Sequence, residues 1–95
     1  METKPILQTL QKNKSHFFKK YPLKSMALFG SYARNEAEEK SDVDIMVEFL
    51  SPVGFEFVDL AIELENILHQ KVDLVSKKGI KPDMLLYIEK DLIYV

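Results

Sequence analysis

One stretch near the middle of the chain constrains the fold more than any other. From Val43 to Phe49, apolar side chains occupy every second position, and the alternate positions carry Asp42, Asp44, Met46 and Glu48. Because successive residues of a strand point to opposite faces of the sheet, this alternation predicts a half-buried strand with one apolar face and one polar face that carries acids. Asp42 and Asp44 then project together from the polar face, with their Cα atoms roughly 7 Å apart.

The other elements follow from apolar spacing and from prolines. Apolar residues at helical spacing predict helices over residues 4–19, 31–35, 55–69 and 84–90, and short apolar runs predict strands over residues 25–29, 72–75 and 92–95. Pro22 ends the first helix, because the residue before a proline avoids the helical conformation. Pro82 stands in the first turn of the last helix, where proline is tolerated. The predicted order, α-β-α-β-α-β-α-β with short links, favours one α/β (α+β) domain over residues 1–95, with helices packed on a small sheet.

Composition excludes several classes of protein. The 95 residues contain no cysteine, which rules out disulfides and thiolate metal sites and fits a cytoplasmic protein. No run approaches the roughly 20 apolar residues that span a bilayer, so we expect no membrane segment. Residues 1–24 carry six lysines and one glutamate. No aromatic stacking platform is interleaved with these lysines, so a solvated helix face is favoured and direct binding of nucleic acid is not expected.

A glycine and a serine connect the first predicted strand to a short helix. Gly30 lets the backbone come close to a phosphate, and Ser31 offers a hydroxyl together with an amide at the start of the helix. Arg34 follows one helical turn later, where it can contact the same anion or form a salt bridge, and the sequence favours neither. A Gly-Ser pair that opens a helix is common, so taken alone it would be structural in most proteins.

Acidic residues supply the second half of a possible site for phosphoryl transfer. The carboxylates of Asp42 and Asp44 repel one another unless a cation neutralises them, and Mg²⁺ is favoured because it prefers oxygen ligands and needs few carboxylates. Asp73 lies in an otherwise apolar strand, where an unpaired charge would be costly. If that strand lies beside Asp42 and Asp44, three carboxylates can converge, and Asp73 would bind metal or take the proton from an attacking hydroxyl. Taken singly, an aspartate at a strand start can simply cap a turn, and Glu48 is expected to face solvent.

The spacing of these residues resembles that of the minimal nucleotidyltransferase (MNT) domains of the DNA polymerase beta superfamily. Those domains carry Gly-Ser, ten intervening residues and Asp-x-Asp on a strand, matched here by Gly30-Ser31 and Asp42-Val43-Asp44. The segment Val72-Asp73-Leu74-Val75 resembles the strand with the third acid, and the resemblance continues to the Ile-Glu-Lys-x-x-x-Tyr-Val tail. Asn35 stands where the family usually has glycine. Asparagine tolerates positive φ, so the turn is expected to survive.

The resemblance implies a polymerase beta-like palm fold and a metal-dependent nucleotidyltransferase. It further implies Mg²⁺ binding and catalysis by Asp42, Asp44 and Asp73, and nucleotide binding by Gly30, Ser31 and Arg34. MNT proteins of this size are typically antitoxins, and their partner is a helical HEPN toxin, so a hetero-oligomer is expected. The implied reaction transfers AMP from ATP to a tyrosine hydroxyl of that toxin. Size favours the same conclusion, because a catalytic core without a second substrate lobe needs an acceptor surface from a partner protein.

Two other functions stay open at this point. The domain could be a catalytically silent binding module that neutralises its partner by occlusion, in which case Asp42→Asn or Asp44→Asn would leave neutralisation intact. Transfer of a nucleotide to a small molecule such as an aminoglycoside is disfavoured, because no helical substrate lobe follows the core.

Overall fold

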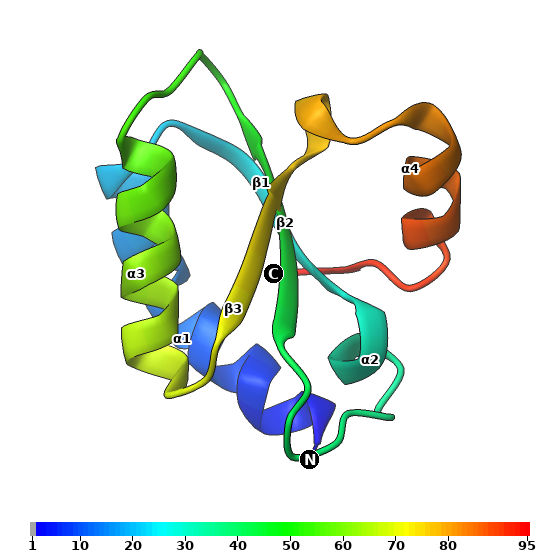
Figure 1. Cartoon of the computed structure of the whole chain (residues 1–95). Helices are drawn as coiled ribbons and strands as arrows, with labels where there is room; N and C mark the ends of the chain where they lie inside the picture. The colour runs from blue at the N-terminus through cyan, green and yellow to red at the C-terminus, as the bar shows by residue number, and fades with distance from the viewer. Residues whose placement is uncertain (1) are drawn as a thin grey trace.

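A computed structural model describes residues 2–95 and contains the predicted elements in the predicted order (Figure 1). The helices are α1 (Thr3–Lys20), α2 (Gly30–Ala33), α3 (Glu56–Leu68) and α4 (Pro82–Glu89), and the strands are β1 (Leu23–Phe29), β2 (Val43–Phe49), β3 (Val72–Ser76) and β4 (Ile93–Tyr94). A short 3-10 turn, Lys77–Gly79, which the sequence did not predict, follows β3. The strand predicted over residues 43–49 is confirmed residue for residue. No helix within residues 2–95 has the length and apolar character needed to cross a membrane.

The four strands form one mixed sheet in the order β3-β2-β1-β4. β1 runs antiparallel to both β2 and β4, whereas β2 and β3 are parallel and are connected through α3. The register places Phe29 opposite Asp44, and Asp44 opposite Asp73. One row of residues therefore crosses three strands near the start of β2, and this row positions the acidic side chains.

The main core lies between the sheet and the two long helices. α1 and α3 cover the same face of the sheet, on the left of Figure 1, and their apolar side chains pack against those of the strands. The alternation predicted for β2 holds on this face, where Val43, Ile45 and Val47 are fully buried. Because Asp44 alternates with these residues, it faces the other side of the sheet, where α2 and α4 stand.

This second face of β2 is more buried than the alternation predicted. Met46 is only 1% exposed, although it shares the face with Asp44. In the register it lies between Ala27 of β1, which is fully buried, and Val75 of β3. Ile88 of α4, on the same side of the sheet, is buried as well. The sequence placed Met46 on this polar face among the acids, and the prediction that the strand is only half-buried is wrong at Met46: the middle of the face is buried and apolar, and the acids are confined to its ends.

Asn35 has a φ of 59°, which confirms that asparagine accommodates the turn where glycine was expected. Its side chain adds a contact that glycine cannot make, since its Oδ1 accepts a hydrogen bond from the backbone N–H of Thr3, 3.1 Å away. The Thr3 hydroxyl also donates to the carbonyl oxygen of Tyr32 in α2. The start of α1 is thereby tied to α2 and to the turn that follows it.

Replacing Asn35 by glycine and by valine should separate the two roles of this residue. Asn35→Gly keeps the positive φ but loses the bond to Thr3, so the free energy of unfolding should fall by about 0.5–1 kcal/mol. Asn35→Val also forces a β-branched residue into positive φ, and the loss should reach about 2–3 kcal/mol. Urea unfolding followed by circular dichroism measures both values, and equal losses would contradict the role of the backbone conformation.

Candidate active site

Three of the predicted site residues gather where β2 begins. Asp44 is the second residue of β2, and Asp42 directly precedes the strand. Asp73 of β3 lies beside Asp44 in the parallel register. The condition under which the sequence predicted converging carboxylates is therefore met, because β3 is the neighbour of β2. The negative charges of Asp42 and Asp73 both act on the Asp44 carboxyl.

Gly30 packs directly against the Asp44 carboxylate. It has a φ of 74°, a conformation that favours glycine. A Cβ atom added to Gly30 would lie 2.1 Å from Oδ2 of Asp44 and 3.0 Å from its Cγ, far inside normal contact distance. Glycine is therefore needed here both for its backbone conformation and for the space it leaves. This close approach brings the start of α2, with Ser31 in its first turn, next to the carboxylate.

The start of α2 has a property that suits an anion. The helix begins at Gly30, directly after β1, and no side chain caps its first turn. Uncapped N–H groups at a helix start favour a negatively charged ligand, although α2 contributes only four residues. The sequence prediction that Gly30 and Ser31 present backbone and hydroxyl groups beside the acids is consistent with this placement.

The electrostatics of Asp44 suit a carboxylate that meets a cation. Partial burial, followed by the negative charges of Asp73 and Asp42, raises the pKa of Asp44 to about 6, while the positive charge of Arg34 opposes this shift. A raised pKa means that the folded protein disfavours the ionised carboxylate in the absence of a cation. A divalent cation beside Asp44 would remove that penalty.

The acidic side chains do not enclose a metal ion by themselves. Within residues 2–95, no group of three His, Cys, Asp or Glu side chains is arranged to hold one. Asp73 is exposed on the edge strand, so the cost of burying its charge, which the sequence argument invoked, does not arise. The carboxylate pair Asp42 and Asp44 still fits Mg²⁺, which takes one or two protein carboxylates and completes its shell with water and substrate phosphates.

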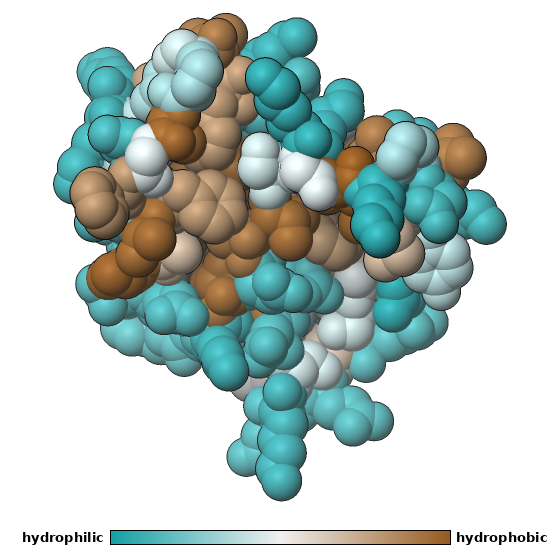
Figure 2. Space-filling view, turned by 45° about the horizontal axis from the view of Figure 1, so that its top comes forward, coloured by the Kyte–Doolittle hydropathy of each residue, from teal (hydrophilic) through white to brown (hydrophobic). Residues whose placement is uncertain are grey.

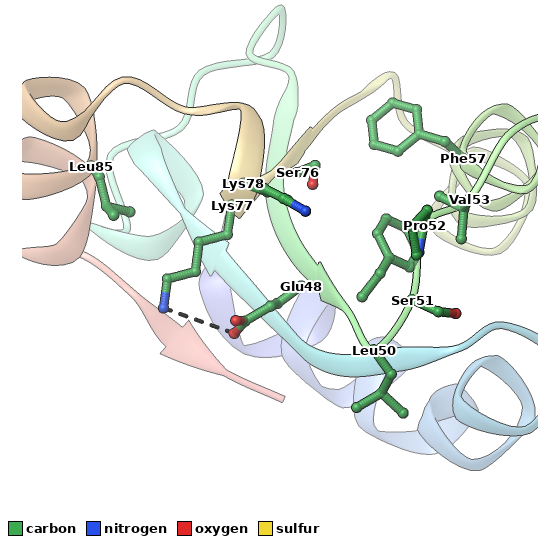
Figure 3. A pocket seen from close by; sticks show the side chains of 11 residues that line it. Glu48, Leu50, Ser51, Pro52, Val53, Phe57, Ser76, Lys77, Lys78 and Leu85 are labelled. Carbon is green, nitrogen blue, oxygen red and sulfur yellow. Dashed lines mark ion pairs between the residues drawn. The ribbon is translucent and has the colours of Figure 1, made fainter.

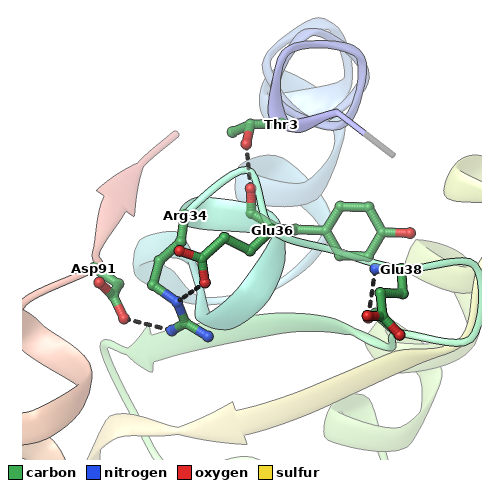
Figure 4. Close-up of polar contacts among 7 residues, drawn as sticks. Thr3, Arg34, Glu36, Glu38 and Asp91 are labelled. Atoms are coloured by element: carbon green, nitrogen blue, oxygen red, sulfur yellow. Dashed lines mark hydrogen bonds and ion pairs between the residues drawn. The ribbon is translucent and has the colours of Figure 1, made fainter.

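Arg34 is engaged in a salt bridge, one of the two roles that the sequence left open (Figure 4). Its Nη1 donates to Oδ2 of Asp91 over 2.8 Å, and its Nε donates to Oε2 of Glu36 over 3.2 Å. These contacts raise the pKa of the guanidinium further above its usual value, first through the bond to Asp91. The same guanidinium still lowers the pKa of Asp44. Arg34 is therefore close enough to Asp44 for its charge to affect the pKa of that carboxyl, and at the same time its guanidinium is bound to Asp91.

Asp91 is a residue of this site that the sequence argument missed. It lies two residues after the end of α4, 57 positions from Arg34, and its side chain is 21% exposed. No local motif connects the two positions, and the tail in which Asp91 lies was noted only for its resemblance to family members. The contact links the short segment between α4 and β4 to the turn that carries the Gly-Ser pair.

Comparison with known proteins addresses the family directly. Residues 10–95 match the family described as nucleotidyltransferase domain, and the match includes all six predicted site residues. The chain belongs to this nucleotidyltransferase family. A polymerase beta-like fold with helices on a small mixed sheet, as the sequence predicted, is thus confirmed.

The nucleotidyltransferase also has curated relatives of similar length. A candidate protein adenylyltransferase from Methanocaldococcus jannaschii is 51% identical over 94 residues, which are 95% of this chain and 94% of the relative. The protein adenylyltransferase MntA from Thermococcus cleftensis is 36% identical over 91 residues, 95% of this chain and 92% of that protein.

Solved structures share the fold. A candidate minimal nucleotidyltransferase superposes with a TM-score of 0.84 at 28% identity, covering 98% of this chain and 95% of the other. A second match, with a TM-score of 0.71 at 22% identity, lies in the complex of a tri-AMPylated Shewanella oneidensis HEPN toxin with an MNT antitoxin, and it covers 94% of this chain and 70% of that one.

Proposed function

We propose that this nucleotidyltransferase is a protein adenylyltransferase, which transfers AMP from ATP to a hydroxyl, that of a tyrosine, on a partner HEPN toxin in the cytoplasm and so acts as its antitoxin. The observation that carries the proposal is the row in which Asp44 stands between the Gly30 turn and Asp73. The name of the Thermococcus cleftensis relative and the toxin complex of the Shewanella oneidensis neighbour support this choice of acceptor.

In this proposal each site residue has one role. Ser31 and the backbone at Gly30 bind the phosphates of ATP, and Arg34 neutralises part of their charge. Asp42 and Asp44 would hold Mg²⁺, which would supply positive charge to the phosphates and the leaving group. The raised pKa of Asp44 agrees with a carboxylate whose negative charge is compensated only when a cation is bound.

Asp73 acts on the acceptor. Its exposed position on the edge strand leaves it open to a hydroxyl from another protein. The carboxylate takes the proton of that hydroxyl, and the oxygen forms a bond to the α-phosphorus of ATP. The bond between this phosphorus and the bridging oxygen breaks, and pyrophosphate leaves with the electron pair. The acceptor keeps AMP as a phosphodiester.

A catalytically silent binding module is the second candidate, and one observation favours it. Arg34, the cation nearest to the predicted phosphate position in sequence, is already paired with Asp91 and Glu36. In this function the domain would block its partner by occlusion.

A ribonuclease assay on a HEPN protein encoded beside the gene for this chain separates the two functions. With ATP and Mg²⁺, the parent chain should silence the ribonuclease. The double variant Asp42→Asn/Asp44→Asn should still bind the toxin but leave it active. Neutralisation by the double variant without ATP would support occlusion instead, and the absence of any complex with the parent chain would contradict both functions.

Removal of divalent cations should stop the transfer. Excess EDTA is expected to slow pyrophosphate release by at least about 100-fold, because the phosphate charge is then uncompensated. Mg²⁺ in excess of the chelator should restore the rate, whereas Ca²⁺, which prefers more ligands at longer distances, should restore it poorly. A rate that stays unchanged in EDTA would contradict the metal-dependent mechanism.

Asp91→Asn should weaken ATP binding about three- to tenfold, because it removes a charge-assisted hydrogen bond that orients the Arg34 guanidinium. Calorimetric titration with a non-hydrolysable ATP analogue and Mg²⁺ measures the dissociation constant. Asp91→Glu keeps the charge and should restore part of the affinity. Glu36→Gln is the matched control, since the Glu36 side chain is 67% exposed and should contribute less than about twofold. Tighter binding by Asp91→Asn would show that Asp91 competes with the phosphates.

A further inference from the structure

An apolar groove opens at the end of the sheet where β2 and β3 both finish (Figure 3). Its volume is about 630 Å³. One wall is formed by the link from β2 to α3, with Leu50 and Val53, and by Phe57 of α3. The other wall comes from the 3-10 turn after β3, with Lys77, and from Leu85 of α4. None of these residues belongs to the predicted catalytic set.

The groove is connected to Asp73 along the edge strand β3. Ser76, the last residue of β3, lines the groove, and the exposed Asp73 lies three residues before it on the same strand. At the rise of an extended strand this spacing corresponds to roughly 10 Å. About three residues of extended polypeptide span that length. A segment that leaves the groove along this edge can therefore place a side-chain hydroxyl beside Asp73.

The order of the strands separates a nucleotide side of the site from an acceptor side. Gly30 and Ser31 follow β1, on one side of β2, whereas Asp73 lies on β3, on the other. The groove is lined by residues from β2 and β3, from the segments that follow these strands, and from α3 and α4, and by none from β1 or α2. It thus lies on the side of Asp73, the residue that takes the acceptor's proton in the proposed reaction.

Exposed apolar side chains lie in the link that forms one wall of the groove. Leu50, which lines the groove, is 70% exposed, and Phe55, in the same six-residue link between β2 and α3, is 87% exposed. Figure 2, in which the top of Figure 1 is turned toward the viewer, shows a hollowed apolar area across this end with hydrophilic side chains around it. Apolar side chains gathered around a groove and rimmed by polar ones are typical of protein contact sites.

Positive charge borders the groove on one side. Lys77 and Lys78 line it, and Lys81 follows the same turn. Glu48 is the one acid among the described lining residues, and Lys77 lies 3.8 Å from it. Among residues 2–95, Lys78 and Lys81 form no ion pair. This rim therefore complements acidic residues that flank an apolar sequence.

We propose that this groove is the docking site for the acceptor protein, which inserts a segment with apolar side chains flanked by acidic residues and so brings its target hydroxyl to Asp73. This inference rests on the proposed function. The groove supplies the acceptor surface that a small catalytic core otherwise lacks. It also explains why an apolar residue such as Leu50 stays exposed in the link between β2 and α3.

Two pairs of substitutions test the proposal on the whole chain. Leu50→Ser/Val53→Ser alters the groove, and Leu86→Ser/Tyr87→Ser alters exposed apolar residues of α4 that do not line it. The probe is the purified HEPN protein encoded beside the gene for this chain, with binding measured by calorimetry and AMP transfer by intact mass. The groove variant should bind at least about tenfold more weakly, whereas the α4 variant should change affinity less than about threefold. Lys77→Glu/Lys78→Glu should also weaken binding, and more so at low salt.

Other uses of the groove predict other results in these experiments. Equal losses for the groove and α4 variants would overturn the proposal, and so would unchanged binding in the groove variant. Weaker binding of a non-hydrolysable ATP analogue by Leu50→Ser/Val53→Ser would show that the groove holds the nucleoside instead. A parent chain that is dimeric by light scattering, with a monomeric groove variant, would assign the surface to a second copy. If the parent chain itself neither binds nor modifies the HEPN protein, the proposed function fails first.

Discussion

Asp44→Asn is expected to lower the rate of AMP transfer by at least about 1,000-fold. Burial, followed by the charges of Asp73 and Asp42, raises the pKa of Asp44, and the Asp44 carboxylate also packs against the Gly30 turn. Asparagine keeps the shape of the side chain but removes the negative charge that would hold the cation, and without the cation the charge of the phosphates is uncompensated. Pyrophosphate release in the presence of the HEPN protein measures the loss.

The same substitution should stabilise the cation-free protein, which distinguishes a chemical defect from misfolding. The pKa of Asp44 is about 6 in the folded chain, above its usual value of 3.8, so ionisation of Asp44 costs stability at high pH. Asp44→Asn should therefore unfold at a higher temperature at pH 8, with a gain of about 1 kcal/mol after allowance for solvent screening. The advantage should shrink as the pH falls from about 6 to about 4, because the folded parent chain then binds a proton.

Glu48→Gln is the matched control for Asp44→Asn. Glu48 lies on the same face of β2, four residues further on, and its side chain is 30% exposed. When both variants are measured without added acceptor, Glu48→Gln should leave pyrophosphate release within about twofold of the parent rate, whereas Asp44→Asn should abolish it, because Glu48 is remote from the Gly30 turn. Equal losses in the two variants would mean that general negative charge on this face, rather than the position of Asp44, supports the reaction.

Gly30→Ala should damage both stability and transfer. The new Cβ atom would have to displace the Asp44 carboxylate, since it would lie 2.1 Å from Oδ2. Alanine is also strained at the φ of 74° that Gly30 adopts. We expect the free energy of unfolding to fall by about 2–3 kcal/mol and the transfer rate of the folded fraction to fall at least about 100-fold.

Gly79→Ala provides the comparison for Gly30→Ala. A Cβ atom added to Gly79 would have no other atom within 4 Å, and Gly79 does not adopt a positive φ. Both stability and transfer should stay close to the parent values. Thermal unfolding, followed by a rate measurement below the transition, separates the two effects of Gly30→Ala. A variant that is destabilised but fully active when folded would contradict the positioning role of the glycine turn.

The sequence predicted most of the fold because its elements have strong periodic patterns. The strand over residues 43–49 follows strict alternation, and the long helices follow apolar residues at helical spacing, so their order and approximate limits could be read directly. Met46 is the exception. Its burial depends on Ala27 and on the placement of α4, which no pattern local to β2 encodes.

The candidate site was predictable only where its residues form a local motif. The sequence positions of Gly30, Ser31, Asp42 and Asp44 sufficed to expect them together. The contact between Arg34 and Asp91 joins positions 57 residues apart, and the groove is assembled from several separate segments. The position of Asp73 beside Asp44 was predicted only on the condition that their strands are neighbours, and its exposure was not foreseen.

The intact mass of the HEPN protein, measured after incubation with this chain, ATP and Mg²⁺, tests the central claim most directly. We predict an increase by whole AMP units that is absent when Asp44→Asn replaces the parent chain. Mapping of the modified peptide should then place the AMP on a tyrosine. An unchanged mass, despite a stable complex between the two proteins, would contradict the adenylyltransferase account and leave occlusion as the function of the domain.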